Sequence, residues 1–219
     1  MEESIQLLDS VKDPSPAVTA RDYCMLTLLL NCGMRVSELV GIDLGDIRDN
    51  TLRLLGKGNK ERMVYLNPAC LSALENYLKF RKQPETGDDR NALFLSAQHR
   101  RMTTRRVEQI VEKYLKACGL DGRGYSPHKL RHTAATLMYQ HGGVDIRALK
   151  EILGHANIGT TEIYTHISNQ MIEQAANASP LSTVKRRMSE QELLLRQLEQ
   201  DQTSQAGENP SSDEHNEPS

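Results

Sequence analysis

Cationic side chains that could bind a phosphate recur along the sequence. A helix beginning at Ser126 would place His128 and Arg131 on one face of its first two turns, because residues three positions apart share a helix face. Arg35 follows a glycine-containing segment and opens a second short helix, so its guanidinium could meet the same anion. An arginine at a helix start is usually a surface residue, and H-x-x-R occurs by chance in many proteins. The pattern therefore indicates an anion site without establishing one.

Lys57 could act as a proton donor to a leaving group. It lies between Gly56 and Gly58, where the glycines would allow a ligand to approach and a flexible ammonium could move into place. An ordinary solvated lysine is the alternative interpretation. The loop is not a Walker A motif, because G-x-x-x-x-G-K-[ST] does not occur in the sequence, and nucleotide hydrolysis loses its main support.

Tyr164 and His155 could add a nucleophile and a further imidazole. A tyrosine early in a helix is normally a half-buried core residue. A phenol has a pKa of about 10, so it is a poor nucleophile unless cations stabilise the phenolate or a base accepts its proton. Two arginines and two histidines could meet both requirements.

A metal site is an alternative use of the histidines. His128 and His132 are four residues apart, and His155 could be a third ligand. The spacing lacks the glutamate of H-E-x-x-H, and Arg131 and Lys129 would oppose a divalent cation electrostatically. We therefore favour a site that uses no metal and no other cofactor.

The elements that must position these residues are expected to be mostly helical. Capping residues and glycines predict a helix from Ala20 to Gly33 with Thr19 as its N-cap, and a short helix over Val36–Val40. Alternation predicts strands at 52–55 and 62–66, joined by a basic hairpin tip at 56–60. Further helices are predicted at 68–81, from Thr103 or Thr104 to about 119, and at 126–142, 144–153 and 161–167. The predicted fold class is mainly α with a small antiparallel β-sheet (α+β).

Composition excludes several classes of protein. The 219 residues carry a net charge of −2 and are 38% hydrophobic, and no apolar run approaches the roughly 18 residues needed to span a bilayer. The start lacks the features of a secretory signal, and the four cysteines form no C-x-x-C pair, so we expect a cytoplasmic protein with reduced thiols that does not associate with membranes.

Basic residues are concentrated in one stretch that could follow a phosphate backbone. Only two acidic residues lie among the six basic ones between positions 100 and 116. A solvated helix face is the alternative interpretation. The residues predicted to contact such a phosphate backbone are Arg100, Arg101, Arg105 and Arg106 in this stretch, Lys60 at the hairpin tip, and Lys129 beside His128.

The charge distribution and turn residues also predict the domain organisation. Residues 1–19, with two prolines, are expected to be a linker-like segment, and 20–184 a single domain. Residues 185–219 form an acidic tail, with four basic and eight acidic residues. A capping box predicts a short helix at about 189–200, and the polar composition beyond it predicts disorder.

In order, the chain contains the motifs GMRVSEL, GKGNKER, PHKLRHT, LGH and TEIYTH. This series, over about residues 17–178, resembles the tyrosine recombinase or phage integrase family, particularly its Xer-like bacterial members. The resemblance implies that Tyr164 attacks a DNA phosphate to give a 3′-phosphotyrosyl bond and a free 5′-hydroxyl. It further implies that Arg35 and Arg131 clamp the phosphate, Lys57 is the general acid, His128 lies beside the nucleophile and His155 is a second phosphate-contacting histidine.

The resemblance also implies partners and leaves alternatives open. Double-stranded DNA would be the substrate, with four protomers on it, identical or paired with a second recombinase, and a monomer or weak oligomer off DNA. A C-terminal segment exchanged between protomers would correspond to 168–178, with Met171, Ile172 and Ala175 as its apolar face. Family members usually carry an N-terminal DNA-clamping domain, so we expect an isolated catalytic domain. A non-cleaving DNA-binding regulator and a type IB topoisomerase-like enzyme remain alternatives.

Overall fold

The computed structural model describes residues 1–56, 58, 60–82, 84, 88–142, 149, 153 and 169–186. The helix predicted at 161–167 and the tail from 187 onward lie outside these residues, as does most of the helix predicted at 144–153. Only Leu149 and Leu153 of that last helix are described, and both are helical and buried. Within the described residues, no helix is long and apolar enough to cross a membrane.

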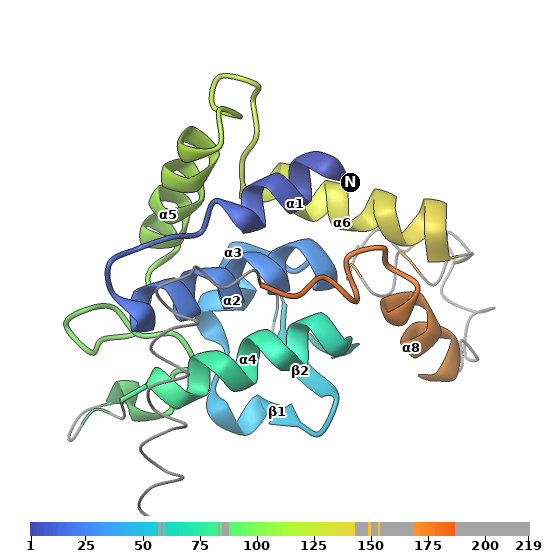
Figure 1. Ribbon diagram of the computed structural model, residues 1–219. Coiled ribbons are helices and arrows are strands. Elements are labelled where there is room, and N and C mark those ends of the chain that lie inside the picture. Colours follow the sequence, from blue (N-terminus) through green and yellow to red (C-terminus); the bar gives the residue numbers. More distant parts are fainter. Residues whose placement is uncertain are drawn as a thin grey trace, which may run out of the picture. The chain divides into compact units, whose positions relative to one another are not determined.

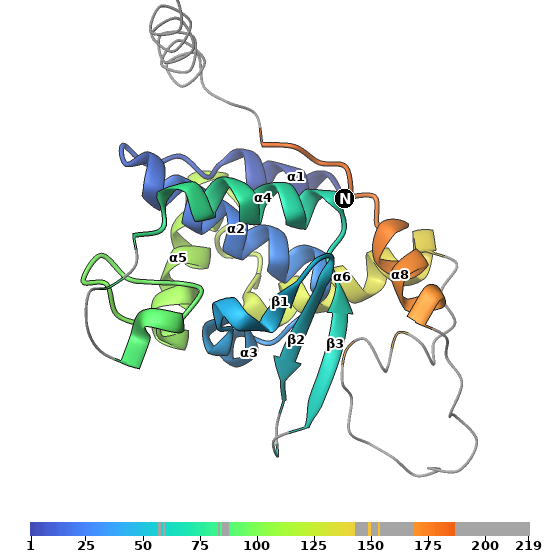
Figure 2. The same cartoon turned by 90° about the horizontal axis from the view of Figure 1, so that it is seen from below.

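Helices predominate, and one small sheet lies beside them (Figures 1 and 2). This arrangement confirms the predicted fold class. The described helices are α1 (Glu2–Asp9), α2 (Pro16–Cys32), α3 (Val36–Gly41), α4 (Pro68–Phe80), α5 (Thr104–Ala117), α6 (Pro127–Gly142) and α8 (Asn169–Asn177), with short 3-10 turns at η1 (Leu44–Asp46) and η2 (Asp88–Asn91). The strands are β1 (Ile47–Arg48), β2 (Thr51–Leu55) and β3 (Glu61–Tyr65).

Short polar side chains fix where the helices begin. The Asn67 side chain accepts a hydrogen bond from the Cys70 backbone N–H at 3.1 Å, and the Thr103 hydroxyl accepts one from the Arg106 N–H at 3.2 Å. These caps satisfy backbone donors that have no partner inside the helix. The predicted starts of α4 and α5 are therefore confirmed.

The predicted start of α2 is wrong by four residues. Ser15 is the N-cap and Pro16 the first helical residue, so the helix begins before Ala20. The Thr19 hydroxyl does not cap a helix, since it donates to the Asp13 carbonyl and accepts from the Asp13 N–H, both at 3.0 Å. Asp22 lies in the core, where it pairs with Arg21 and accepts from the Tyr114 hydroxyl.

The first nineteen residues also differ from the linker that the sequence suggested. Helix α1 occupies Glu2–Asp9 and buries Leu7 and Leu8 in the main core. Polar contacts hold it to α5 and the loop after it: the Gln6 amide donates to the Cys118 carbonyl at 2.8 Å, and Arg123 pairs with Glu3. The described residues thus pack as one unit that extends from Met1 to Arg186.

The sheet is antiparallel, with strand order β1-β2-β3. Both predicted strands are confirmed within one residue, whereas the two-residue β1 was not predicted. Leu52 and Leu54 of β2 are buried and face Val64 and Arg62 of β3 in the register. Because side chains alternate along a strand, Arg62 is on the same side of the sheet as the buried Val64.

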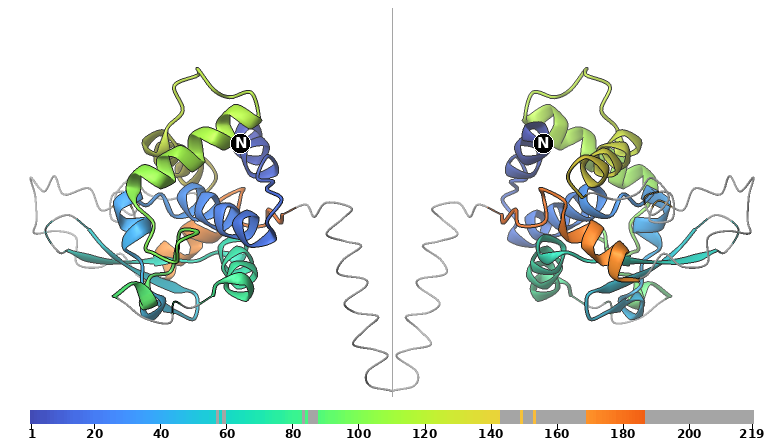
Figure 3. Two further views of the ribbon diagram at one scale, coloured as in Figure 1. Left: turned by 90° about the vertical axis from the view of Figure 1, so that its left-hand side faces the viewer. Right: turned by 90° about the vertical axis from the view of Figure 1, so that its right-hand side faces the viewer.

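Helix α2 is at the centre of the described fold. Nearly all of its residues are buried, between α4 on one side and α1 and α6 on the other (Figures 1 and 3). It ends at Gly33, whose φ of +58° suits a glycine and turns the chain into α3. This turn brings Arg35 towards the first turns of α6.

Residues after α8 return to the same core. The Ala69 N–H donates to the Ser182 carbonyl at 2.8 Å, and Leu181 is fully buried. Ala175 packs with Leu153 and Ala134 in a second cluster, while the Met171 and Ile172 side chains are not among those described. Exchange of this segment between protomers stays a prediction.

Candidate functional site

Two backbone carbonyls hold the Arg131 guanidinium in place. Its Nη1 donates to the Gly33 carbonyl at 2.7 Å, and its Nη2 donates to the Leu153 carbonyl. Only 7% of Arg131 is exposed. The α2–α3 turn and the residues around Leu153 therefore fix the orientation of this guanidinium.

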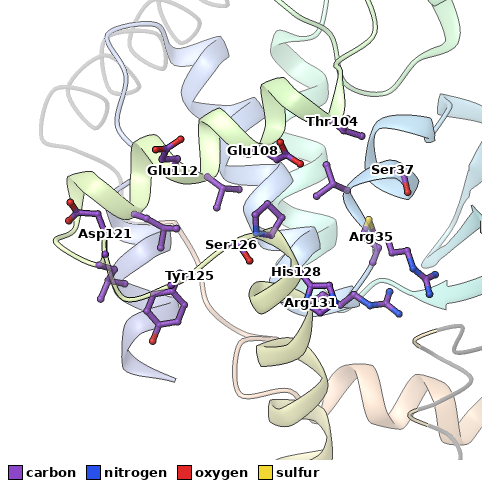
Figure 4. Close-up of a pocket in the computed structure, with 18 residues that line it drawn as sticks. Arg35, Ser37, Thr104, Glu108, Glu112, Asp121, Tyr125, Ser126, His128 and Arg131 are labelled. Atoms are coloured by element: carbon purple, nitrogen blue, oxygen red, sulfur yellow. The ribbon is translucent and has the colours of Figure 1, made fainter.

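Contacts with α3, the helix that follows it, hold Arg35 in place. It is the N-cap residue of α3, and its backbone N–H donates to Glu38 Oε2 at 2.7 Å. Its Nη1 also donates to Glu38 Oε1 at 2.9 Å, while its side chain remains 38% exposed. In Figure 4 the Arg35 and Arg131 guanidiniums lie beside each other and point the same way.

His128 completes the group on the α6 side. The Ser126 hydroxyl accepts from the Lys129 N–H at 3.4 Å, and Pro127 is the first residue of α6, one residue after the predicted start. His128 is exposed and lines the same pocket as Arg35 and Arg131 (Figure 4). The structure therefore brings three of the predicted site residues to one pocket, although Arg35 is far from the other two in sequence.

The other three predicted catalytic residues lie outside the described part of the chain. These are Lys57, His155 and Tyr164. The neighbours of Lys57 are described, and the Gly56 N–H donates to the Lys60 carbonyl at 2.8 Å, as the predicted hairpin requires.

Sequence reasoning missed two residues at this site, Glu38 and Arg62. Arg62 forms a bidentate pair with the Glu38 carboxylate, with Nη1–Oε1 at 2.6 Å and Nη2–Oε2 at 2.8 Å. Glu38 is buried, and Arg131 Nη1 lies 3.9 Å from its Oε2. The sequence feature that could have revealed this pair is the position of Arg62, because an arginine at an inward-facing strand position requires a nearby acid.

Burial and hydrogen bonding have opposite effects on the Glu38 carboxyl. Burial raises its pKa, but hydrogen bonds from Arg62 and from the Arg35 backbone outweigh burial and hold the pKa below its ordinary value. Glu38 is therefore ionised at neutral pH and supplies a fixed negative charge among three guanidiniums.

Burial is also the main influence on Arg131. Burial and, to a lesser extent, the neighbouring Arg35 lower the pKa of this guanidinium to about 10, while Glu38 opposes the shift. Arg131 still carries its proton at neutral pH. A buried, charged guanidinium beside a second one suits a site that receives an anion with two exposed oxygens.

The residues predicted to contact DNA differ in how the structure uses them. Arg101 is held within the protein: its Nη1 donates to the Val40 and Ile42 carbonyls, and its Nη2 pairs with Asp43 at 2.5 Å. This arrangement supports a structural role for Arg101 rather than the predicted DNA contact. The other five, Arg100, Arg105, Arg106, Lys60 and Lys129, are exposed.

Comparison with known proteins gives a consistent result. The sequence matches the phage integrase family over residues 2–171. It is 51% identical over 183 residues to the tyrosine recombinase XerC of Caldanaerobacter subterraneus subsp. tengcongensis, covering 83% of this chain and 50% of that protein. It is 37% identical over 175 residues to XerD of Proteus mirabilis, covering 78% of this chain and 56% of that protein. The chain thus spans about half the length of the curated relatives it matches.

Solved structures share the fold. The XerA recombinase aligns with a TM-score of 0.61 at 30% identity, over 79% of this chain and 61% of that one. The XerH site-specific recombinase bound to palindromic difH substrate, in a post-cleavage complex, aligns with a TM-score of 0.62 at 30% identity, over 80% and 51% of the two chains. The family match covers most of the sequence, and the paired arginines and the H-x-x-R helix agree with it. The chain therefore belongs to the phage integrase family.

Proposed function

We propose that this chain is the catalytic part of a site-specific DNA recombinase that cleaves and rejoins duplex DNA through Tyr164. The observation that carries the proposal is the juxtaposition of Arg35 and Arg131, two charged guanidiniums that meet at one pocket beside His128. XerC and XerD are tyrosine recombinases by name, and the XerH site-specific recombinase has been solved bound to its difH substrate.

Each step of the proposed reaction assigns a role to a side chain of this chain. The Tyr164 oxygen attacks the phosphorus while His128, beside the nucleophile, accepts the phenol proton. The bond to the 5′-oxygen breaks, and Lys57 gives that oxygen a proton. Arg35 and Arg131 stabilise the negative charge that develops on the non-bridging oxygens, which raises the rate because that charge is greatest in the transition state. His128 and His155 contact the phosphate and its surroundings.

The reaction is reversible without an external energy source. The phosphotyrosyl bond conserves the free energy of the cleaved phosphodiester. A 5′-hydroxyl from another strand can therefore attack its phosphorus and release the phenol. We infer that the step needs no nucleotide and no metal ion, and that four protomers perform it in turn on two duplexes. A reaction on chromosomal DNA would take place in the cytoplasm of a bacterial cell.

The test is a trapping assay that does not require the target sequence in advance. The chain is incubated with a pool of duplexes of randomised sequence that carry a nick near the centre. Cleavage next to the nick releases a short 5′-hydroxyl fragment, so the protein stays attached to the DNA. A covalent band on a denaturing gel, removed by protease, is the expected result, and sequencing the captured DNA identifies a substrate.

Variants and additives separate the alternatives. Tyr164→Phe should give no covalent band, and EDTA should leave the band unchanged. DNA binding without any covalent band would favour the non-cleaving regulator. Relaxation of a supercoiled plasmid that carries the captured sequence, without strand exchange between two such sites, would favour the topoisomerase-like activity.

A further inference from the structure

Arg62 is directed at Glu38. Its side chain is only 12% exposed, and both of its terminal nitrogens are hydrogen-bonded to the Glu38 carboxylate. Arg35 is much more exposed, at 38% of its side chain, and lines the pocket. A direct role in holding DNA therefore fits Arg35 and not Arg62.

Glu38 would have two opposing effects on the pair of guanidiniums, Arg35 and Arg131. Two guanidiniums repel each other when they are brought together for one phosphate, and a buried carboxylate between them reduces that repulsion. The same carboxylate would compete with the phosphate if the guanidiniums turned their donors fully onto it. A third cation that occupies the carboxylate would remove this competition.

The geometry matches that solution. Arg62 donates one hydrogen bond to each Glu38 oxygen, and Arg35 Nη1 donates one to Oε1 at 2.9 Å, whereas Arg131 Nη1 lies 3.9 Å from the carboxylate, beyond hydrogen-bond distance. Arg131 instead uses that nitrogen on the Gly33 carbonyl. With three guanidiniums and one carboxylate the group has a net charge of +2, and without Arg62 it would have +1.

The Arg62–Glu38 pair also lies next to the start of the hairpin tip that contains Lys57. A Cβ added at Gly56 would be 3.6 Å from Glu38 Oε1 and 3.9 Å from Arg62 Nη1. Arg62 faces Leu54 in the β2–β3 register, two residues before Gly56. The pair therefore links the base of the hairpin tip to α3.

We propose that Arg62 is a positioning residue that occupies both oxygens of Glu38, and so leaves the Arg131 guanidinium and the exposed part of the Arg35 guanidinium available to the DNA phosphate. This inference rests on the proposed recombinase function. It predicts that the effect of removing Arg62 depends on the charge of Glu38, which a direct DNA contact would not require. A role in stability alone would change the folded fraction but not the rate constant of the folded protein at saturating DNA.

The test is a double-mutant cycle on the full chain, with one DNA sequence captured from the randomised pool. Single-turnover formation of the covalent band is followed as DNA concentration is varied, which separates the rate constant at saturation from the half-saturating concentration. The variants are Arg62→Met, Arg62→Lys, Glu38→Gln and Arg62→Met with Glu38→Gln. Arg53→Met is the matched control, because Arg53 lies on the neighbouring strand and pairs with Asp46 and Glu61 while remaining half-exposed.

Arg62→Met should lower the rate constant about 100-fold, since it leaves a buried carboxylate to compete for the clamp. Arg62→Lys should retain about tenfold more activity than Arg62→Met, because an ammonium supplies the charge without the bidentate geometry. With Glu38→Gln already present, adding Arg62→Met should change the rate by less than about threefold. Arg53→Met should behave as the unaltered chain.

Two results would overturn the inference: an Arg62→Met rate constant close to that of the unaltered chain, or an equal loss with and without Glu38→Gln. If Arg62→Met alone does not fold, the comparison between Glu38→Gln and the double variant still decides, because neither contains the unpaired acid. Failure of the unaltered chain to form any covalent band would instead overturn the proposed function, and this inference with it.

Discussion

At the scale of single residues, the charge of Glu38 organises the site. Its carboxylate is within 3 Å of donors from Arg35 and Arg62, and within 4 Å of Arg131. A buried acid with this many cationic neighbours is stabilised only in its ionised form. The stability of the fold should therefore depend on pH through this group.

Glu38→Gln should lower the free energy of unfolding at pH 7 by about 3 kcal/mol, because it leaves the buried arginines without their counter-ion. The folded-state pKa of Glu38 lies below its ordinary value of 4.5, so the stability it contributes is present above that pH and is lost as pH falls through the folded-state pKa. Denaturant unfolding at several pH values should show the difference between the two proteins shrinking in acid. Glu75→Gln, at an exposed position on α4, is the control and should have little effect at any pH.

The sequence identified Arg35, His128 and Arg131 because each belongs to a local motif that can be read without the fold. Glu38 and Arg62 were missed as site residues because their role comes from a contact between α3 and β3 that local spacing does not encode. Arg101 was predicted to contact DNA because it belongs to a run of basic residues. Such a run indicates a charged surface but does not reveal which members bind backbone carbonyls. The structure does not describe Lys57, His155 and Tyr164, so their roles stay predictions.

At the scale of elements, the junction between α2 and α3 positions the clamp. Gly33 has a positive φ, its carbonyl accepts from Arg131, and a Cβ there would lie 2.8 Å from Leu153 Cδ2. Leu153 supplies the second carbonyl that holds Arg131. A side chain at position 33 would therefore strain the turn and displace an anchor of the guanidinium.

Gly33→Ala should lower the free energy of unfolding by about 1–2 kcal/mol from backbone strain, and should slow covalent-band formation by tenfold or more. Gly119→Ala is a matched control, because Gly119 has a φ of +70° but no atom within 4 Å of an added Cβ. It should cost similar stability and leave the reaction rate unchanged. Equal rates for the two variants would show that the junction does not position the site.

Elements with strong local signals were predicted more accurately than those without. The caps Asn67, Thr103 and Ser126 each fixed a helix start to within a residue. Helix α1 was missed because it is short and precedes two prolines, and its role depends on Leu7 and Leu8 packing into a core formed by later elements. Thr19 misled the prediction of α2 because a threonine that bonds its own upstream loop has the same sequence pattern as an N-cap.

At the scale of the whole molecule, binding to DNA should depend on charges spread over its surface. Arg105 and Arg106 lie in the first turn of α5, and both are exposed. Glu108 lies 3.9 Å from Arg105, a distance that makes an exposed pair weak. Both arginines are therefore suited to contact phosphates.

Replacing Arg105 and Arg106 with glutamine should weaken duplex binding and reduce the slope of log affinity against log salt by about one to two. Fluorescence anisotropy with a labelled duplex at several salt concentrations measures the slope. Arg101→Gln is the control, since its donors are used within the protein: it should lower stability and leave the slope unchanged. A slope unaltered by the double change would place the DNA elsewhere.

The most direct measurement is to identify the amino acid that carries the DNA in the trapped complex. Nuclease and protease digestion followed by tandem mass spectrometry should find a nucleotide joined through its 3′-phosphate to the peptide that contains Tyr164. Attachment at another residue, such as the exposed Tyr139, or through a 5′-phosphate, would contradict the proposed chemistry.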